Sequence, residues 1–332
     1  MNKKSLAIVG ATGLVGRKVL EILEEEDIIF DNYYLFASKK SAGKNIFFKN
    51  KLYEVKELNE KSFDNKIDYA IFVAGTEASK KYIPIANSKG CIVIDNSSFF
   101  RMNKDVPLIV PEINLNCISE KDKLIANPNC STIQAVIALA PLNKRYRIKR
   151  IVYSTYQAVS GAGKYGMEDL INGMNNYCLK GHEYNLKKFK YPIINNCIPQ
   201  IDVFEKDGYS KEEYKLINET RKILNNDNIK ITATCVRVPV LNSHCESINV
   251  EFEEDFEISE VKEILRKSKN VIVIDKNENY PMPIFTNGTN NVYVGRIRRD
   301  FSNSNSLNLW VVADNLRRGA AYNAVEILKN IM

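Results

Sequence analysis

The chain has 332 residues, a formal net charge of +7 and 45% hydrophobic residues. These values exclude a disordered chain, a collagen-like chain and a coiled coil, and they allow a core large enough for two domains. Only two histidines, His182 and His244, are present, and none of the seven cysteines has C-x-x-C spacing. We therefore expect no metal site and predict reduced thiols in a cytoplasmic protein.

The first 38 residues predict a βαβ unit. Residues 5–9 are a short apolar run typical of a buried strand, and the glycine turn GATGLVG follows at 10–16. Apolar side chains then recur at helical spacing over residues 14–26, and residues 33–37 predict a second strand. This order is typical of the start of a dinucleotide-binding domain.

The alternation of strands and helices continues to about residue 127. Apolar runs predict strands at 69–74, 91–95 and 124–126, with a helix at 77–89 that Pro84 interrupts. Such alternation favours a parallel sheet with both faces covered. We therefore expect a Rossmann-type domain over residues 1–127.

The pattern changes in the second half of the chain. Long alternating or apolar runs predict strands at 150–159, 229–238, 247–252 and 308–313. Residues 166–200 have no clean period and predict short helices and loops, whereas 314–332 predict a closing helix. We expect an α/β protein in which residues 128–313 form an α+β domain with a mixed or antiparallel sheet. The final helix returns to the first domain.

Membrane and nucleic-acid partners are not expected. No apolar run reaches the 18 residues that would predict a membrane-spanning helix, and the N-terminal apolar stretch is too short for a secretory signal. The densest basic cluster, KRYRIKR at 144–150, is typical of a solvated helix end leading into a strand. The positive balance suits anionic small ligands.

The glycine turn predicts the cofactor. Gly10, Gly13 and Gly16 would let backbone N–H groups and a helix N-terminus approach a pyrophosphate. The loop after the second strand, SKKSAGK at 38–44, contains no acidic residue for ribose hydroxyls. Its lysines, with Ser38 and Ser41, can hold a 2′-phosphate, so the sequence favours NADP over NAD.

Cys130 and His244 are the candidates for nucleophilic chemistry. Cys130 lies in NPNCST, just before an apolar helix, and a helix N-terminus favours the thiolate form. His244 follows a predicted strand, whereas His182 lies in a polar, tyrosine-rich segment and is expected at the surface. The sequence alone leaves open whether Cys130 is a nucleophile or a buried thiol, because a Cys–His pair must be close in space.

Further polar residues are candidates for ligand contacts. Gln157 precedes a second glycine turn that includes Ser160 and Gly161. Arg101 and Arg237 are candidate clamps for carboxylate or phosphate groups, although an arginine can equally serve in a structural ion pair.

Taken together, these segments resemble aspartate-β-semialdehyde dehydrogenases of the bacterial type. The matching segments follow the family's order over nearly the whole chain: GATGLVG at 10–16, SKKSAGK at 38–44, DNSSFFRM at 95–102, NPNCST at 127–132, STYQAVSGAG at 154–163, SKEEYK at 210–215, RVPV at 237–240 with Ser243 and His244, VGRIRRD at 294–300 and LNLWVVADNLRRGAAYNAVEI at 307–327.

The resemblance implies a cytoplasmic, homodimeric enzyme of amino-acid biosynthesis (lysine through diaminopimelate, threonine, methionine and isoleucine). Its reaction would be the NADPH-dependent reductive dephosphorylation of L-aspartyl 4-phosphate to L-aspartate 4-semialdehyde, with residues 128–313 as the catalytic and dimerisation domain. A thiolate suits this chemistry, because it can displace phosphate and leave a thioester that hydride reduces.

The resemblance also implies a role for each matching residue. Cys130 matches the nucleophile, His244 the general acid/base and Gln157 the residue that positions the thioester. Arg237 matches the clamp for the substrate α-carboxylate, Glu212 the carboxylate near the α-ammonium, and Arg101 with Lys215 the phosphate-binding pair. The residues that match cofactor contacts are Thr12, Gly13, Leu14, Val15, Ser38, Lys40, Ser160, Gly161 and Asn315.

Three positions depart from the family pattern, and two alternatives remain. Lys40 stands where Arg is frequent, Ser243 where Gly is common and Cys245 where Ser is common, so the NADP preference and the local loop are expected to differ. One alternative is a reductase of the N-acetyl-glutamyl-phosphate type, against which Glu212 argues because a carboxylate suits a free ammonium. The other is a dinucleotide-binding regulator without catalysis, which predicts an unreactive Cys130.

Overall fold

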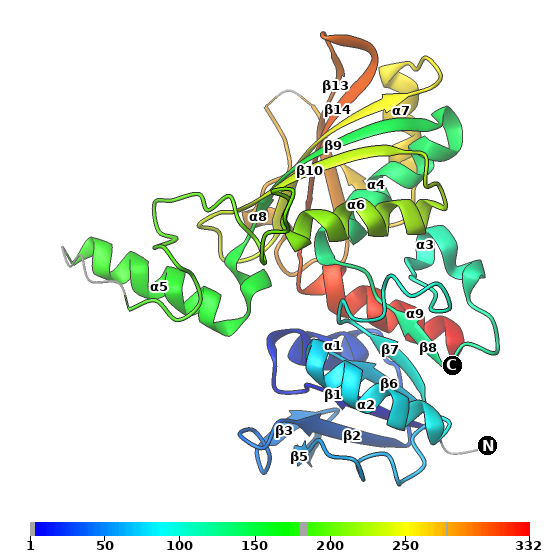
Figure 1. Cartoon of the computed structure of the whole chain (residues 1–332), viewed down its shortest axis with the longest axis vertical. Helices are drawn as coiled ribbons and strands as arrows, with labels where there is room; N and C mark the ends of the chain where they lie inside the picture. The colour runs from blue at the N-terminus through cyan, green and yellow to red at the C-terminus, as the bar shows by residue number, and fades with distance from the viewer. Residues whose placement is uncertain (1–3, 180–184, 277) are drawn as a thin grey trace. The chain divides into compact units, whose positions relative to one another are not determined.

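The computed structural model describes residues 4–179, 185–276 and 278–332. The chain divides into two compact units. The first comprises Met1–Asn129 and Ala320–Met332, and the second comprises Cys130–Gly319. His182, expected at the surface, lies outside the described residues. Figure 1 shows the elements of each unit with their labels.

A parallel sheet is the centre of the first unit. Its strands run in the order β5-β2-β1-β6-β7-β8, and every neighbouring pair is parallel. This arrangement confirms the Rossmann-type sheet, because the fully buried runs that fill β1 and β6 need cover on both faces. The bounds are β1 (Ser5–Val9), β2 (Asn32–Ala37), β5 (Lys56–Glu57), β6 (Tyr69–Phe72), β7 (Ile92–Asp95) and β8 (Leu124–Ala126).

Helices cover both faces of this sheet. Leu6 and Ile8 pack with α1 (Leu14–Glu25) and α9 (Asn323–Ile331), whereas Ala7 and Val9 pack with α2 (Thr76–Ser88) on the other face. The C-terminal helix therefore belongs to the core of the first unit. The expectation that Pro84 interrupts α2 is wrong. Pro84 and Lys80 are both exposed, so water can satisfy the carbonyl that loses its helical donor.

Smaller elements complete the first unit. The strands β3 (Asn45–Phe48) and β4 (Lys51–Glu54) form an antiparallel hairpin that the apolar pattern did not predict. A short helix α3 (Pro111–Asn114) and a 3₁₀ turn η1 (Leu115–Cys117) precede β8.

A mixed sheet of six strands is the centre of the second unit. The order is β10-β9-β11-β14-β13-β12, in which β10/β9 and β12/β13 are parallel and the three central pairs are antiparallel. The predicted mixed sheet is therefore confirmed. The bounds are β9 (Ile148–Gln157), β10 (Lys230–Arg237), β11 (His244–Phe252), β12 (Val271–Val273), β13 (Val292–Asp300) and β14 (Asn303–Ala313).

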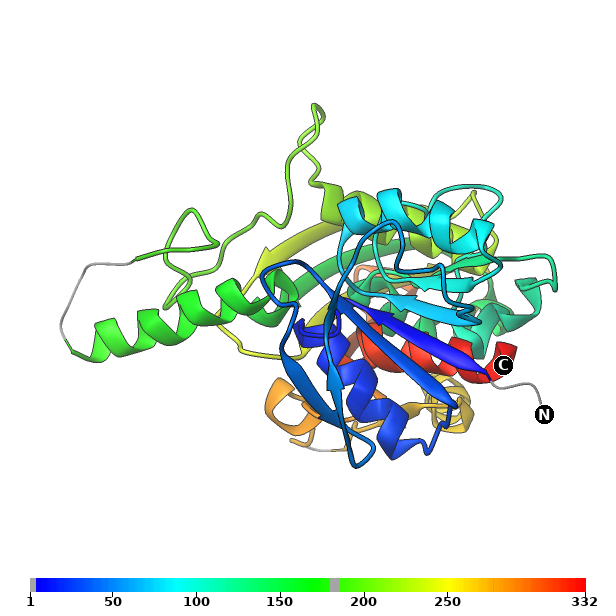
Figure 2. The same cartoon turned by 90° about the horizontal axis from the view of Figure 1, so that it is seen from below.

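Helix α4 (Cys130–Tyr146) contacts two other helices of the second unit and the sheet. This largely buried helix contacts strands β9, β11, β13 and β14, and it also contacts α6 (Lys211–Leu224) and α7 (Ile258–Lys267). The other elements are η2 (Val159–Ala162), α5 (Lys164–Cys178), α8 (Pro283–Thr286) and the π-helical turn η3 (Arg317–Tyr322), which crosses the boundary between the units. Helix α5 projects away from the mixed sheet (Figures 1 and 2).

Several expected bounds are corrected. Residues 164–178 form one 15-residue helix where short helices were expected, and the predicted closing helix is divided into η3 and α9. His244 follows the strand expected at 229–238, which is β10, and it is itself the first residue of β11, whose start was expected at residue 247. Strands β12 and β13 and helix α7 were not predicted from the apolar pattern.

Among the described residues, no helix is long and apolar enough to cross a membrane. No cluster of three or more His, Cys, Asp or Glu residues in the same ranges could hold a metal ion.

Candidate active site

Cys130 is the first residue of α4, directly after the loop that follows β8. The first turn of a helix leaves N–H groups without intrahelical acceptors, and their positive partial charge favours a thiolate there. Gly319 packs against this cysteine: a Cβ atom at position 319 would lie 2.7 Å from the Cys130 Cβ. Only glycine therefore fits beside Cys130 without displacement.

The environment of Cys130 differs from that of the other thiols. Burial raises the pKa of the Cys91 and Cys245 thiols to about 12 and also raises that of Cys235. Such thiols stay protonated and are poor nucleophiles. The remaining cysteines, Cys117, Cys178 and Cys197, are exposed, whereas Cys130 alone among the seven is half-buried.

His244 is fully buried, with a fixed ring orientation. Its Nδ1 accepts a hydrogen bond from the Ala158 backbone N–H at 3.0 Å. The neutral ring therefore carries its proton on Nε2, which has no hydrogen-bond partner among the described residues. Burial, and next the positive charge of Arg237, lower the pKa of His244 to about 3. The imidazole is thus a neutral donor at Nε2.

Arg237 and Gly161 lie beside this imidazole. Arg237 ends β10, is 5% exposed and donates from Nη1 to the Ala158 carbonyl at 2.6 Å. A Cβ atom at position 161 would lie 2.9 Å from Arg237 Nη1 and 3.2 Å from His244 Nε2. The absence of a side chain at Gly161 leaves both groups accessible from this side. Arg237 also interacts electrostatically with Cys130, which lies near enough to raise the arginine pKa against the larger lowering by burial.

A buried polar chain links Gln157 to α6. Thr155 Oγ1 donates to Gln157 Oε1 at 3.0 Å, and Gln157 Nε2 donates to Glu212 Oε1 at 3.1 Å. Lys215 Nζ donates to Glu212 Oε2 at 3.2 Å and to Asp202 Oδ2 at 2.8 Å. Burial opposes the charge of Lys215, but the two carboxylates outweigh burial and raise its pKa. Lys215 is therefore a permanent cation in an ion-paired cluster.

Ser160 and Asn315 lie together in the second unit. Ser160 Oγ donates to Asn242 Oδ1 at 2.8 Å, and Asn315 Nδ2 donates to Ser160 Oγ at 3.0 Å. Asn315 Oδ1 accepts from the Ser243 N–H at 3.0 Å. Ser243 has a φ of 73°, the left-handed conformation that favours glycine. The departure from glycine noted in the sequence therefore falls on a conformation that glycine adopts more easily.

The first unit holds the glycine turn and the basic loop. Gly10 has a φ of 97°, and a Cβ atom on Gly16 would lie 2.2 Å from the Gly10 carbonyl oxygen, so both positions need glycine for packing. Gly13 is the N-cap of α1 and offers no side-chain cap, which leaves the amides of the first turn open to an anion. The loop residues Ser38, Lys39 and Lys40 are exposed beyond β2, and Ser41 is half-buried.

Arg101 also lies in the first unit. It is 7% exposed and donates from Nη2 to the Asn96 carbonyl at 2.8 Å, just beyond the end of β7. The structure thus groups the candidates of the second unit near Cys130 and His244, and places Arg101 with the cofactor candidates in the first unit. Sequence reasoning missed Ala158, Gly319 and Asn242, although the glycine in RRGAA at 317–321 was a signal for close packing.

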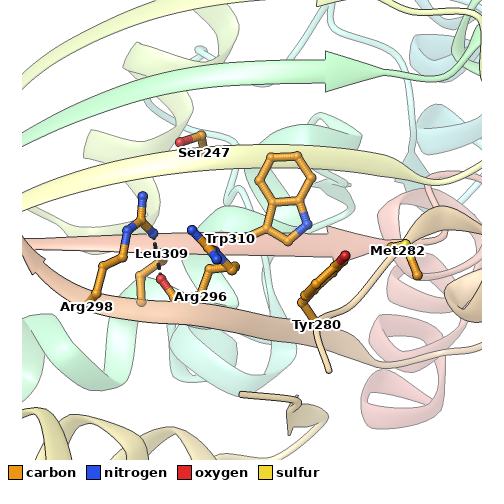
Figure 3. Close-up of a pocket in the computed structure, with 7 residues that line it drawn as sticks. All are labelled: Ser247, Tyr280, Met282, Arg296, Arg298, Leu309 and Trp310. Carbon is orange, nitrogen blue, oxygen red and sulfur yellow. Dashed lines mark hydrogen bonds between the residues drawn. The ribbon is translucent and has the colours of Figure 1, made fainter. Parts of the chain in front are cut away.

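A cavity of about 420 Å³ lies on the other face of the mixed sheet. Figure 3 shows its lining residues: Ser247, Tyr280, Met282, Arg296, Arg298, Leu309 and Trp310. Ser247 and Glu246 are neighbours in β11, so their side chains leave opposite faces of the sheet. This cavity is therefore separate from the Cys130 site.

Comparisons with known proteins agree with these features. Residues 5–121 match the family model "Semialdehyde dehydrogenase, NAD binding domain", and residues 139–318 match "Semialdehyde dehydrogenase, dimerisation domain". A protein named aspartate-semialdehyde dehydrogenase from Campylobacter jejuni is 51% identical over 331 residues, which cover 98% of this chain and 96% of the relative.

Solved structures show the same fold. The aspartate semialdehyde dehydrogenase II of Vibrio cholerae complexed with ASA has a TM-score of 0.94 at 40% identity, covering 99% of this chain and 98% of that chain. The Candida albicans enzyme with NADP has a TM-score of 0.74 at 25% identity, covering 99% of both chains. The chain therefore belongs to the aspartate-semialdehyde dehydrogenase family.

Proposed function

We propose that this protein converts L-aspartyl 4-phosphate to L-aspartate 4-semialdehyde through a thioester on Cys130. The observation that carries the proposal is the position of Cys130 at the N-terminus of α4, near Arg237, whose guanidinium lies beside the His244 imidazole. These groups supply a nucleophile, a cation and a neutral donor.

Each covalent step follows from these groups. The Cys130 thiolate attacks the acyl carbon, a C–S bond forms, and the C–O bond to phosphate breaks so that phosphate leaves. The Nε2–H of His244 donates to the acyl oxygen as negative charge develops there. A bound nicotinamide dinucleotide supplies the hydride that reduces the acyl carbon. The C–S bond then breaks, which releases the aldehyde and restores the thiolate.

Arg237 and Glu212 bind the two charged groups of the amino-acid substrate. Arg237 holds the α-carboxylate, and Glu212 holds the free α-ammonium. Gln157, anchored by Glu212 and Thr155, holds the thioester in place. An N-acetylated substrate offers Glu212 no cation, so we expect the enzyme to reject N-acetylglutamate semialdehyde.

NADP is the proposed cofactor. The first turn of α1, with the uncapped Gly13 before it, suits a pyrophosphate. Gly10, Thr12, Leu14 and Val15 are the other proposed contacts of this glycine turn and helix start. The lysines and serines at 38–41, without an acidic residue, suit the 2′-phosphate, and all but the half-buried Ser41 are exposed. Ser160, Gly161 and Asn315 are the proposed cofactor contacts of the second unit.

Arg101 and Lys215 are the proposed phosphate ligands. The two carboxylates beside Lys215 mean that phosphate must share this cation with Asp202 and Glu212. We therefore expect modest phosphate affinity and a strong dependence on ionic strength.

We propose that a second copy of the chain packs on the sheet face that carries the Figure 3 cavity. This half of the chain matches a dimerisation-domain model, and Tyr156 and Trp310 form a ring pair 5.5 Å apart on that face. Trp310 is the only tryptophan in the chain, so its emission reports on the interface. The Tyr156→Glu variant should sediment as a monomer with shifted emission; an unchanged dimer would exclude this face.

The cellular setting follows from the same family. No disulfide joins cysteines among the described residues, which suits a reducing cytoplasm. We propose that the product serves the biosynthesis of lysine, threonine, methionine and isoleucine.

The decisive assay is phosphate-dependent reduction of NADP by aspartate semialdehyde, run beside NAD and beside N-acetylglutamate semialdehyde. We expect turnover only with phosphate, with NADP preferred and the acetylated aldehyde inactive. Preference for the acetylated aldehyde would overturn the substrate, and preference for NAD would overturn the cofactor.

A further inference from the structure

Glu246 is a carboxylic acid inside the second unit that the proposed reaction does not use. It is fully buried in β11, two residues after His244, so the two side chains share one face of the sheet. Neither of its carboxyl oxygens has a well-formed hydrogen bond among the described residues. A buried carboxyl of this kind needs a partner or a proton.

The polar neighbour of Glu246 is the Gln134 side chain from α4. Gln134 is fully buried, and its amide lies close enough to Glu246 to lower the carboxyl pKa. Its Nε2 donates to the His244 carbonyl at 3.4 Å, whereas its Oε1 has no partner in the described parts of the chain. Gln134 also lies one helical turn after Cys130, on the same side of α4.

The hydroxyls near Glu246 have other hydrogen-bond partners, and the described residues around it bring no cation. Thr155 lies opposite it on β9 but donates its hydroxyl proton to Gln157, and the Tyr153 hydroxyl pairs with Thr220. Cys235 and Cys245 are buried thiols, and a negative charge on Glu246 raises the pKa of both, in addition to the larger effect of burial. No cation among the described residues acts on Glu246.

These contacts favour a neutral carboxylic acid. Burial raises the pKa of Glu246 well above its ordinary value, and the Gln134 amide opposes this only in part. An ionised Glu246 would keep its charge in a fully buried position where neither oxygen has a well-formed hydrogen bond. A protonated Glu246 has an O–H donor, and the neighbouring Gln134 Oε1, which has no partner among the described residues, is an acceptor for it.

We propose that Glu246 is a positioning residue. It joins α4 to β11 through Gln134 and so fixes the position of the Cys130 thiol relative to the His244 imidazole. The bridge connects the helix that begins with the nucleophile to the strand that begins with the donor. Arg237 and Glu212 stand on β10 and α6, outside this bridge. The proposal rests on the proposed function for the roles of Cys130 and His244.

The test compares two substitutions of Glu246 by steady-state kinetics. Glu246→Gln keeps a neutral side chain with a donor for Gln134 Oε1, so we expect kcat, KM and the pH profile to match the wild type. Glu246→Leu removes the bridge but fills the space, and we expect kcat to fall by about 10- to 100-fold, as small misplacements of reacting groups do. KM for the aldehyde should stay within about twofold, because Arg237 and Glu212, the proposed substrate-binding residues, are unchanged.

Three further variants separate positioning from general packing. Gln134→Leu should lower kcat as Glu246→Leu does, and the double variant should lose no more, because both remove one bridge. Ile248→Val, a fully buried change on the same strand, is the matched control and should keep kcat.

The outcomes are distinct. Wild-type kcat in Glu246→Leu, or a loss in Glu246→Gln as large as that in Glu246→Leu, overturns the proposal. Should Glu246→Leu not fold, full kcat in Gln134→Leu overturns it. A wild-type enzyme without turnover would contradict the proposed function instead. In that case infrared spectroscopy still tests the neutral bridge: the wild type should show the carbonyl band of a protonated acid at neutral pH, and Glu246→Gln should lack that band. The same band in Glu246→Gln would overturn the proposal.

Discussion

The backbone N–H of Ala158 donates to Nδ1 of His244 at 3.0 Å, which places the proton of the neutral ring on Nε2. In the proposed reaction His244 acts as a neutral donor to the acyl oxygen, and the N-terminus of α4 favours the thiolate form of Cys130. With the proposed roles divided in this way, a histidine with a pKa of about 3 can serve a reaction at neutral pH.

The buried neutral histidine makes stability depend on pH. The unfolded chain binds a proton on His244 near pH 6.5, whereas the folded chain binds it only near pH 3, so acid favours unfolding. Between pH 8 and pH 5 the wild type should lose about 2 kcal/mol of unfolding free energy relative to His244→Gln. Urea titrations of both proteins at each pH measure this difference. Parallel pH curves would contradict the buried neutral ring.

Ser243→Gly should stabilise the protein by about 1 kcal/mol, because a non-glycine residue with φ of 73° is strained. The matched control is Ser306→Gly on β14, whose hydroxyl, like that of Ser243, is buried without a partner among the described residues. Ser306 has no positive φ, so this control should lose stability. Urea unfolding measures the free energy of unfolding of both variants. An equal change in the two would contradict backbone strain at Ser243 as the cause.

Gly319→Ala should lower kcat by about 10²-fold, because the new methyl group displaces Cys130. Gly173→Ala in α5, which meets only the Ile194 side chain, is the control and should keep full activity. The alkylation rate of Cys130 by iodoacetamide, measured by peptide mass spectrometry, should change only in the first variant. Normal kinetics in Gly319→Ala would show that the contact is not restrictive.

Lys40→Ala should weaken NADP binding by about tenfold and leave NAD binding unchanged, since one charge-assisted contact to the 2′-phosphate is lost. Lys40→Arg should strengthen NADP binding, because a guanidinium contacts phosphate with two hydrogen bonds. Lys51→Ala, on the exposed hairpin strand β4, is the charge-matched control. An equal loss of affinity for NADP and NAD in Lys40→Ala would show that this loop does not bind the 2′-phosphate.

Local patterns predicted the parts of the fold that have local causes. The buried run of β1, the glycine turn and the amphipathic α1 follow from residues within reach of one another. Strands β12 and β13 and the β3–β4 hairpin were missed for different reasons. Strand β12 has only three residues, β4 is largely exposed, and the register shifts in β13 break its alternation. Helix α2 continues through Pro84 because the exposed carbonyl can be hydrated, which no local pattern reveals.

The same limit applies to the site. The sequence pointed to Cys130 and His244 by residue type, but the Ala158 bond that sets the histidine tautomer spans 86 residues. The contact of Gly319 with Cys130 and the pairing of Glu246 with Gln134 are likewise distant in sequence. The domain boundary and the roles of the site residues remain predictions, and the variants above test those roles.

The most direct test of the central claim is to trap the acyl enzyme. The enzyme is mixed with L-aspartyl 4-phosphate without NADPH, quenched in acid and analysed by peptide mass spectrometry, beside Cys130→Ala and Cys197→Ala. We predict an aspartyl adduct on the Cys130 peptide of the wild type and of Cys197→Ala. Cys130→Ala should show none and lose at least about 10³-fold in turnover while it still binds NADPH. Ordinary turnover by Cys130→Ala, or an adduct on another residue, would contradict the thioester mechanism.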